Sequence, residues 1–203
     1  MQLNSIVSGW TIFLLLTGAC QAAPLQDFSR GSTAVAIEWR PNVEMRHTPV
    51  DTVPTAVELG LTHGIGDKTA LEFRHSSYDS FYKTRDTSRN NELNLLYKYN
   101  DNIQFYSGYS STSVREAGSS RRLENTSWQF GLIALKPLTA KTTVYAVVGV
   151  GNHLTNIEAG WSYLLGPGLE LDATYRHLSV EKLGGEIVKA HLRGFGLGVT
   201  YKF

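Results

Sequence analysis

Two short stretches of the chain could bring a general base next to a hydroxyl nucleophile. They read His177-Leu178-Ser179 and His75-Ser76-Ser77. Side chains two residues apart lie on the same face of a β-strand, so in each stretch a base and a hydroxyl could meet. The alternative interpretation is that both pairs are polar residues at the wet ends of strands.

A second group of residues could form ion pairs rather than react. Charged side chains recur at alternate positions along several apolar stretches, so each stretch has one apolar face and one charged face. Glu170 and Asp172 share such a face, and salt bridges explain them better than acid–base catalysis. The expected network comprises Glu38, Arg40, Glu58, Glu72, Arg74, Lys98, Glu158, Asp172 and Arg176.

Basic residues near the loops could contact phosphate groups, because arginine binds phosphate through two hydrogen bonds. Acidic residues lie among them, so solvated polar loops are the alternative. The remaining histidines show no metal-ligand spacing, and no metal or cofactor is expected. The basic residues of the two longer loops are Lys83, Arg85, Arg89, Arg115, Arg121 and Arg122. The main candidates for contact with lipid or lipopolysaccharide are Lys189, Arg193, Arg121 and Arg122.

All these residues must be positioned by strands, because apolar and polar residues alternate through most of the chain. The apolar face would meet lipid and the polar face a lumen, which predicts an all-β, antiparallel transmembrane β-barrel of about ten strands, with eight as the alternative. Short turns alternate with longer loops at 79–91 and 111–124. The predicted strands are 33–40, 57–62, 71–74, 93–99, 103–109, 128–134, 142–151, 157–163, 169–176 and 194–203, and the facing of 142–151 is ambiguous.

The N-terminal region has the features of a signal peptide. Its apolar run, 6–17, is shorter than the roughly 20 residues of a membrane-spanning helix, and small residues suited to cleavage after Ala22 follow it. Cys20, the single cysteine, would leave with this peptide or, alternatively, carry a lipid. We therefore expect a signal peptide at 1–22 and one outer-membrane barrel domain at 23–203.

The last third of the chain resembles the small outer-membrane β-barrel proteins of the OmpA/OmpX-like group, whose members usually have eight strands. The resemblance is carried by 147–151, by Leu169-Glu170-Leu171-Asp172-Ala173-Thr174-Tyr175-Arg176 and by Gly198-Val199-Thr200-Tyr201-Lys202-Phe203. It implies that the barrel assembly machinery recognises Gly198, Tyr201 and Phe203. The stretch from Arg176 to Ser179 is also similar to the motif of a lipid A 3-O-deacylase, although Val180 stands where that family has asparagine. This resemblance implies a third catalytic residue, a glutamate on the next strand, for which Glu186 is the nearest candidate.

These observations predict a monomeric barrel in the outer membrane, exported through the inner membrane by its signal peptide. Its lumen would be filled, because wide aqueous channels need about 16 strands. We expect a non-enzymatic role in envelope structure, or in surface interaction and adhesion through the extracellular loops. The formal net charge of +1 gives no general attraction to nucleic acid. The alternatives are an outer-leaflet lipid A hydrolase using His177 and Ser179, and a narrow channel for small solutes.

Overall fold

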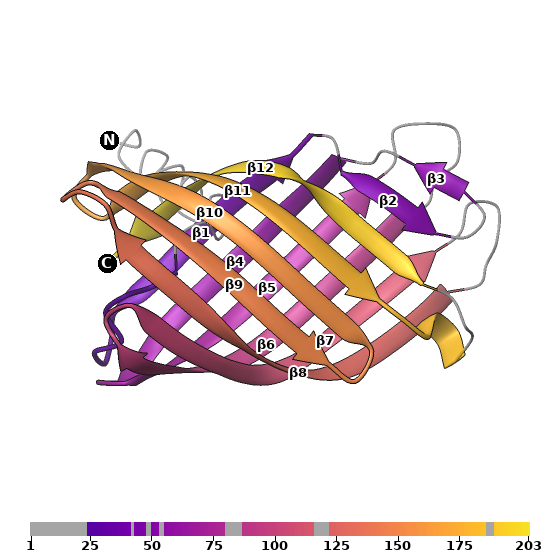
Figure 1. The fold of residues 1–203 in the computed structure, drawn as a ribbon, viewed down its shortest axis with the longest axis horizontal. Coiled ribbons are helices and arrows are strands. Elements are labelled where there is room, and N and C mark those ends of the chain that lie inside the picture. The colour runs from indigo at the N-terminus through magenta and orange to yellow at the C-terminus, as the bar shows by residue number, and fades with distance from the viewer. Residues whose placement is uncertain are drawn as a thin grey trace, which may run out of the picture.

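The computed structural model describes residues 24–41, 43–47, 50–52, 55–79, 87–115, 122–185 and 189–203, so the expected signal peptide lies outside the described residues. Almost all of this part of the chain is strand (Figure 1). None of its helices is long and apolar enough to cross a membrane. The elements are β1 (Thr33–Arg40), β2 (Glu44–His47), β3 (Val50–Thr52), β4 (Thr55–Gly66), β5 (Thr69–Asp79), β6 (Thr87–Asn100), β7 (Ile103–Arg115), β8 (Arg122–Pro137), β9 (Thr142–Gly151), β10 (Leu154–Gly166), β11 (Leu169–Val180), the 3-10 turn η1 (Leu183–Gly185) and β12 (Ala190–Lys202).

The sheet closes on itself. Each strand from β4 to β11 pairs antiparallel with the next, and β1 pairs with both β4 and β12. The closing seam ends in two backbone hydrogen bonds between Thr33 and Phe203, of 2.7 and 2.9 Å. β2 and β3 form a hairpin that continues the ladder along the start of β12. The barrel therefore has ten strands, as predicted, and not the alternative eight.

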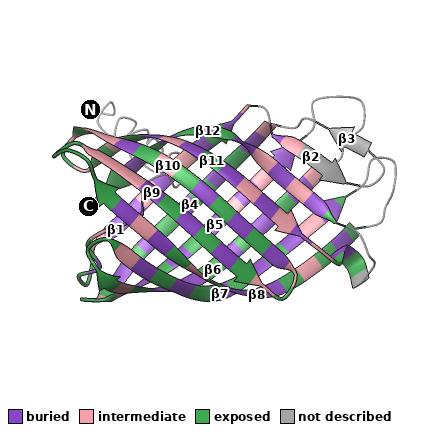
Figure 2. Cartoon of the chain, in the orientation of Figure 1, coloured by how far each residue is buried: buried purple, intermediate pink, exposed green. Residues whose placement is uncertain are grey.

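The outer and inner faces have opposite chemistry. Buried and exposed residues alternate along every barrel strand, which gives the striped pattern of Figure 2. Outward-facing side chains in the middle of the wall are apolar, such as Leu93, Phe130 and Leu197, although they are exposed. An apolar exterior around a polar interior is the arrangement of a transmembrane barrel. The ambiguous strand β9 follows the same rule, because Tyr145 and Val147 face the lumen.

The two ends of the barrel differ. At one end, here called the terminal end, Thr33 meets Phe203, and the turns are short; the β10–β11 turn at Gly166-Pro167-Gly168 lies where predicted. The other end, the loop end, carries the β2–β3 hairpin and η1 (Figure 1). The predicted loops 79–91 and 111–124 were too long, because β6 begins at Thr87 and β7 runs to Arg115. Ladder hydrogen bonds continue there although outward-facing residues have become polar, so the alternation signal fades before the strand ends.

The lumen is filled in three layers. An apolar layer at the terminal end includes Leu96, Tyr106 and Tyr145, and a second apolar layer at the loop end includes Tyr78 and Leu178. Charged and amide side chains lie between them. η1 closes the loop end, where the Leu183 side chain is fully buried in the second apolar layer.

Residues 24–32 form a plug at the terminal end. Most residues of this segment are polar, but Leu25 and Phe28 join the first apolar layer and are 3% and 0% exposed. Gln104 donates to the Leu25 carbonyl at 2.8 Å, and Lys98 donates to the Gln26 carbonyl at 2.9 Å. The plug also lies on Gly64, where an added Cβ would come within 2.6 Å of the Phe28 carbonyl oxygen.

Replacing Phe28 with alanine should lower the free energy of unfolding by about 3 kcal/mol, because the change empties part of the packed terminal layer. Urea unfolding in phospholipid vesicles, followed by tryptophan fluorescence, measures this change. Leu138→Ala is the matched control, since Leu138 lies exposed beyond the end of β8 and should have little effect. Equal stabilities of the two variants would contradict a packing role for the plug.

Candidate functional site: the ionic network in the lumen

The middle layer of the lumen is built by alternate residues of strands that lie on different sides of the barrel. β1 contributes Glu38 and Arg40, and β11 contributes Arg176. All three side chains are buried, because inward parity directs them away from the apolar exterior. The other charged members are Glu58 from β4, Arg74 from β5, Glu92 from β6 and Glu158 from β10.

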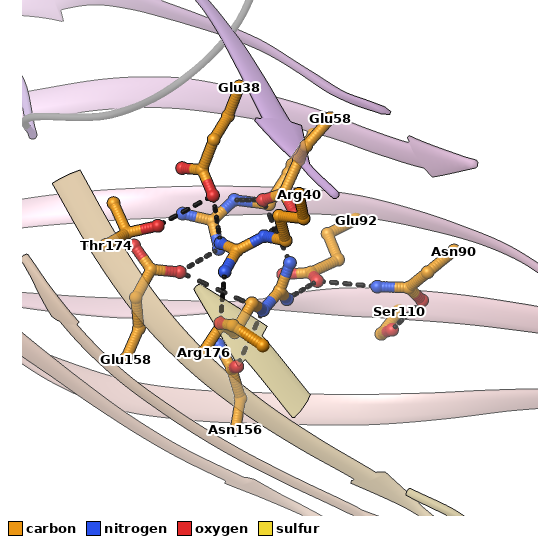
Figure 3. Close-up of polar contacts among 12 residues, drawn as sticks. Glu38, Arg40, Glu58, Asn90, Glu92, Ser110, Asn156, Glu158, Thr174 and Arg176 are labelled. Carbon is orange, nitrogen blue, oxygen red and sulfur yellow. Dashed lines mark hydrogen bonds and ion pairs between the residues drawn. The ribbon is translucent and has the colours of Figure 1, made fainter. Parts of the chain in front are cut away.

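Arg176 is the centre of this network (Figure 3). Its Nη1 donates to Glu58 Oε1 at 2.9 Å, and its Nη2 donates to Glu92 Oε1 at 2.5 Å. Its Nε donates to Asn156 Oδ1 at 2.9 Å. Every nitrogen of the guanidinium therefore has an acceptor, although the side chain is only 2% exposed.

The other two arginines extend the network across the lumen. Arg40 contacts Glu38 at 2.5 Å and donates to the Gly194 carbonyl at 3.0 Å. Arg74 Nη1 donates to Glu158 Oε2 at 3.0 Å, and its Nε lies 3.5 Å from Glu58 Oε1. Since burial of an unpaired charge is strongly unfavourable, each group depends on its partners to remain ionised in this layer.

Uncharged side chains satisfy the carboxylates further. Thr174 donates to Glu38 at 2.6 Å, and Asn90 donates to Glu92 at 2.6 Å (Figure 3). Gln129 also donates to Glu92, at 3.2 Å. These contacts hold the network as a fixed polar core rather than a row of mobile charges along a pore.

Glycines in the wall make room for the large lumen side chains. A Cβ on Gly196 of β12 would lie 1.9 Å from Glu38 Oε1, and one on Gly149 of β9 would lie 1.9 Å from the Tyr106 hydroxyl. Each glycine thus marks a place where a side chain from another strand lies against the backbone. On the polar face of the final strand, Gly196 makes this room for Glu38.

The structure brings together six of the nine residues expected in the lumen network: Glu38, Arg40, Glu58, Arg74, Glu158 and Arg176. Glu72 accepts from Asn94 at 2.8 Å beside this group. Lys98 lies apart at the terminal end, where its ammonium pairs with Asp101 at 2.8 Å and lowers the pKa of that carboxyl by hydrogen bonding and by charge. Asp172 is fully buried but forms no ion pair within the described residues.

Glu92 and Asn156 were missed by the sequence analysis. Glu92 was placed at the edge of a predicted loop, next to a strand that began at Leu93. The inward parity of Asn94 and Leu96 extends back to Glu92, and this was the signal that could have found it.

The possible catalytic residues face outward near the loop end. His177 and Ser179 share the outer face of β11, and no hydrogen bond joins their side chains. The His177 ring instead lies 6.0 Å from that of His191. Glu186 lies outside the described residues. In the other His-x-Ser stretch, His75 Nδ1 forms a hydrogen bond of 2.7 Å with Asn91 Oδ1.

Three of the four cations expected at the lipid surface lie on the outside near the loop end, and each has an acidic partner. Lys189 pairs with Glu181, and this hydrogen bond lowers the pKa of Glu181. Arg193 pairs with Glu44, and Arg122 pairs with Glu124, both at 2.6 Å. Arg121 lies outside the described residues.

The residues expected to guide assembly lie together on the closing strand. Tyr201 and Phe203 are exposed on the outer face, with ring centroids 5.6 Å apart. Gly198 faces the lumen and is paired with Glu38 of β1 and Asp172 of β11.

No protein-family model matches the chain, and no curated protein matches it in sequence. Among solved structures, it is similar to Neisserial surface protein A, with 16% identity over 85% of this chain and 97% of that one, and a TM-score of 0.49. It is also similar to the Yersinia pestis outer membrane protein Ail, with 13% identity over 86% and 100% of the two chains and a TM-score of 0.43. A third similar structure is the N-terminal β-barrel domain of Pseudomonas aeruginosa OprF, with 14% identity over 86% of this chain and 98% of that one, and a TM-score of 0.37. The barrel fold of this chain is established by its own strand pairing, in which β1 pairs with β12.

Replacing Arg176 with methionine should lower the free energy of unfolding by about 3–5 kcal/mol, because Glu58 and Glu92 would stay buried without their guanidinium partner. Arg176→Lys should be intermediate, since an ammonium restores the charge but not the planar set of donors. Urea titration of the folded barrel in vesicles measures both variants.

Lys189→Met is the control for this comparison. It removes an exposed ion pair, with Lys189 52% exposed and Glu181 46% exposed, so the free energy of unfolding should stay unchanged within error. A similar effect from Arg176→Met and Lys189→Met would mean that the lumen network contributes no more than a surface pair.

Proposed function

We propose that this protein is a non-conducting barrel of the bacterial outer membrane that serves envelope structure, or surface interaction and adhesion through its extracellular loops. The observation that supports this function best is the filled lumen, in which a hydrogen-bonded ionic layer lies between two apolar layers. A scaffold of this kind holds the ends of its strands in fixed positions at the cell surface.

The orientation in the membrane forms part of the proposal. Outer-membrane barrels have short turns in the periplasm and longer loops outside, so the terminal end would face the periplasm. A signal peptide at 1–22 would export the chain through the inner membrane. The barrel assembly machinery would then recognise Gly198, Tyr201 and Phe203 on the closing strand, and the barrel would act as a monomer.

A narrow channel is less well supported. A cavity of about 400 Å³ opens at the terminal end, between the plug and the ends of β10–β12. It is lined by residues of that end, including Leu25, Glu170 and Lys202, and no member of the ionic network is among its lining residues. The hydrolase alternative relies on His177 and Ser179, which face the lipid side near the loop end without a mutual hydrogen bond.

Loop shortening tests the proposed role. Residues 80–86 and 116–121 would each be replaced by a short Gly-Ser linker, with the barrel strands unchanged. If the protein is an adhesion scaffold, cells producing this variant should lose adherence while keeping wild-type resistance to detergent. If it is an envelope structure protein, deletion of the whole gene should raise detergent sensitivity, and the loop variant should restore resistance. Wild-type behaviour of deletion cells in both assays would refute the proposal.

Purified wild-type protein should give no discrete conductance steps in planar bilayers, because the ionic and apolar layers leave no continuous water path. A 16-stranded porin reconstituted in the same bilayers is the positive control. Reproducible steps that vanish when the protein is omitted would support the narrow channel instead.

Production of the protein should leave the mass spectrum of lipid A unchanged, because no hydrogen bond joins the side chains of His177 and Ser179. Cells with the gene deleted are the control for this comparison. Loss of an acyl chain that depends on both residues, as shown with His177→Ala and Ser179→Ala, would establish the hydrolase.

A further inference from the structure

A cationic hollow lies on the outer surface near the loop end, away from the lumen network. It has a volume of about 170 Å³ and is lined by Thr87 and Arg89 of β6, Ser113 and Arg115 of β7, and Arg122 of β8. These positions have the same outward parity as the apolar residues lower on the same strands. The hollow therefore opens to the surroundings of the barrel.

The strand register brings like charges together in this hollow. Arg115 and Arg122 are direct partners across the β7–β8 ladder, and Arg89 lies opposite Ser113 on the neighbouring ladder. Side chains directly opposite each other in a sheet are close neighbours, and a pair of like charges there is unfavourable. An anion bound between the guanidinium groups would convert this repulsion into attraction.

Two of the three arginines of the hollow have no ion pair within the described residues. Arg122 pairs with Glu124 at 2.6 Å and donates to Ser113 Oγ at 3.2 Å. Within the part of the chain that the structure describes, neither Arg89 nor Arg115 has an ion pair. Among the described residues, the three guanidinium groups of the hollow thus form one ion pair, whereas Lys189 and Arg193 on the other side of the loop end each have an acidic partner.

The height of the hollow fits the headgroup region of a membrane. Leu93, Tyr109 and Trp128 form one row across the three strands below it, and the rings of Tyr109 and Trp128 are 3.9 Å apart. Aromatic side chains of this kind mark the boundary between hydrocarbon and headgroups. Arg89 precedes Leu93 by four residues in β6, so it lies about 13 Å from this row along the extended strand. The distance along the membrane normal is smaller, because the strand is tilted.

We propose that this hollow binds a phosphate group of a phosphorylated glycolipid in the outer leaflet. Arginines at this level can each donate two hydrogen bonds to phosphate oxygens, and Thr87 and Ser113 supply hydroxyl donors. The inference depends on the proposed orientation, with the loop end outside the cell. It assigns the lipid contact mainly to Arg89 and Arg115, which the sequence places among the basic loop residues but not among the main candidates.

Binding to purified lipopolysaccharide tests this proposal. The full-length protein in zwitterionic detergent would be titrated with deep-rough lipopolysaccharide, with the same lipid after chemical removal of its phosphates, and with inorganic phosphate. Wild-type protein should bind the phosphorylated lipid at least about ten-fold more tightly than the dephosphorylated lipid. Arg89→Ala/Arg115→Ala should lose this preference.

Arg30→Ala is the matched control, because Arg30 is an exposed arginine of the plug at the opposite end of the barrel. It should keep the full preference for phosphorylated lipid. Unchanged binding by the double variant would overturn the site, and inorganic phosphate binding as tightly as the lipid would overturn its assignment to a lipid. Heat-dependent gel mobility of each variant reports separately whether the barrel has folded. A variant that folds but does not bind the lipid has therefore lost the phosphate site alone, and the proposed structural or adhesive role of the barrel is tested independently.

Discussion

The whole structure depends on the absence of water in hydrocarbon. A strand edge in the middle of a bilayer would leave backbone groups without partners, so β1 has to meet β12, and this seam runs from Trp39 and Leu197 down to Thr33 and Phe203. Closure at ten strands encloses a lumen too narrow for a wide aqueous channel but large enough to need filling. Closure of the seam therefore determines the volume of the lumen that side chains have to fill.

Two kinds of side chain, apolar and charged, fill the lumen of this barrel. Apolar layers occupy both ends, and a charged layer occupies the middle, where each arginine has carboxylate or carbonyl partners. Glycines such as Gly196 in the wall let long side chains cross the lumen. The alternation also makes the register decisive, since a slip of one residue in β11 would turn Arg176 toward lipid and Tyr175 toward the charged layer.

The sequence predicts the parts that follow from local alternation. The number of barrel strands and the inward facing of residues such as Arg74 and Arg176 follow from a period of two. It does not predict the plug, because Leu25 and Phe28 lie in a polar segment without periodicity. Nor does it predict which charges meet, because Arg176 and Glu58 are 118 residues apart and touch only through the curvature of the closed sheet. The ends of β6 and β7 were missed because polar residues follow the apolar stretch on the outer face.

The origin of the network residues has a consequence for the order of folding. Its charged members come from β1, β4, β5, β6, β10 and β11, so the first strands of the barrel hold charges whose partners are on nearly the last. A partly built sheet would hold glutamates such as Glu58 next to lipid without Arg176, which is strongly unfavourable. Insertion should therefore be cooperative, with the charged layer completed only when the first and last strands join. A half-formed barrel should therefore not be a stable intermediate in the membrane.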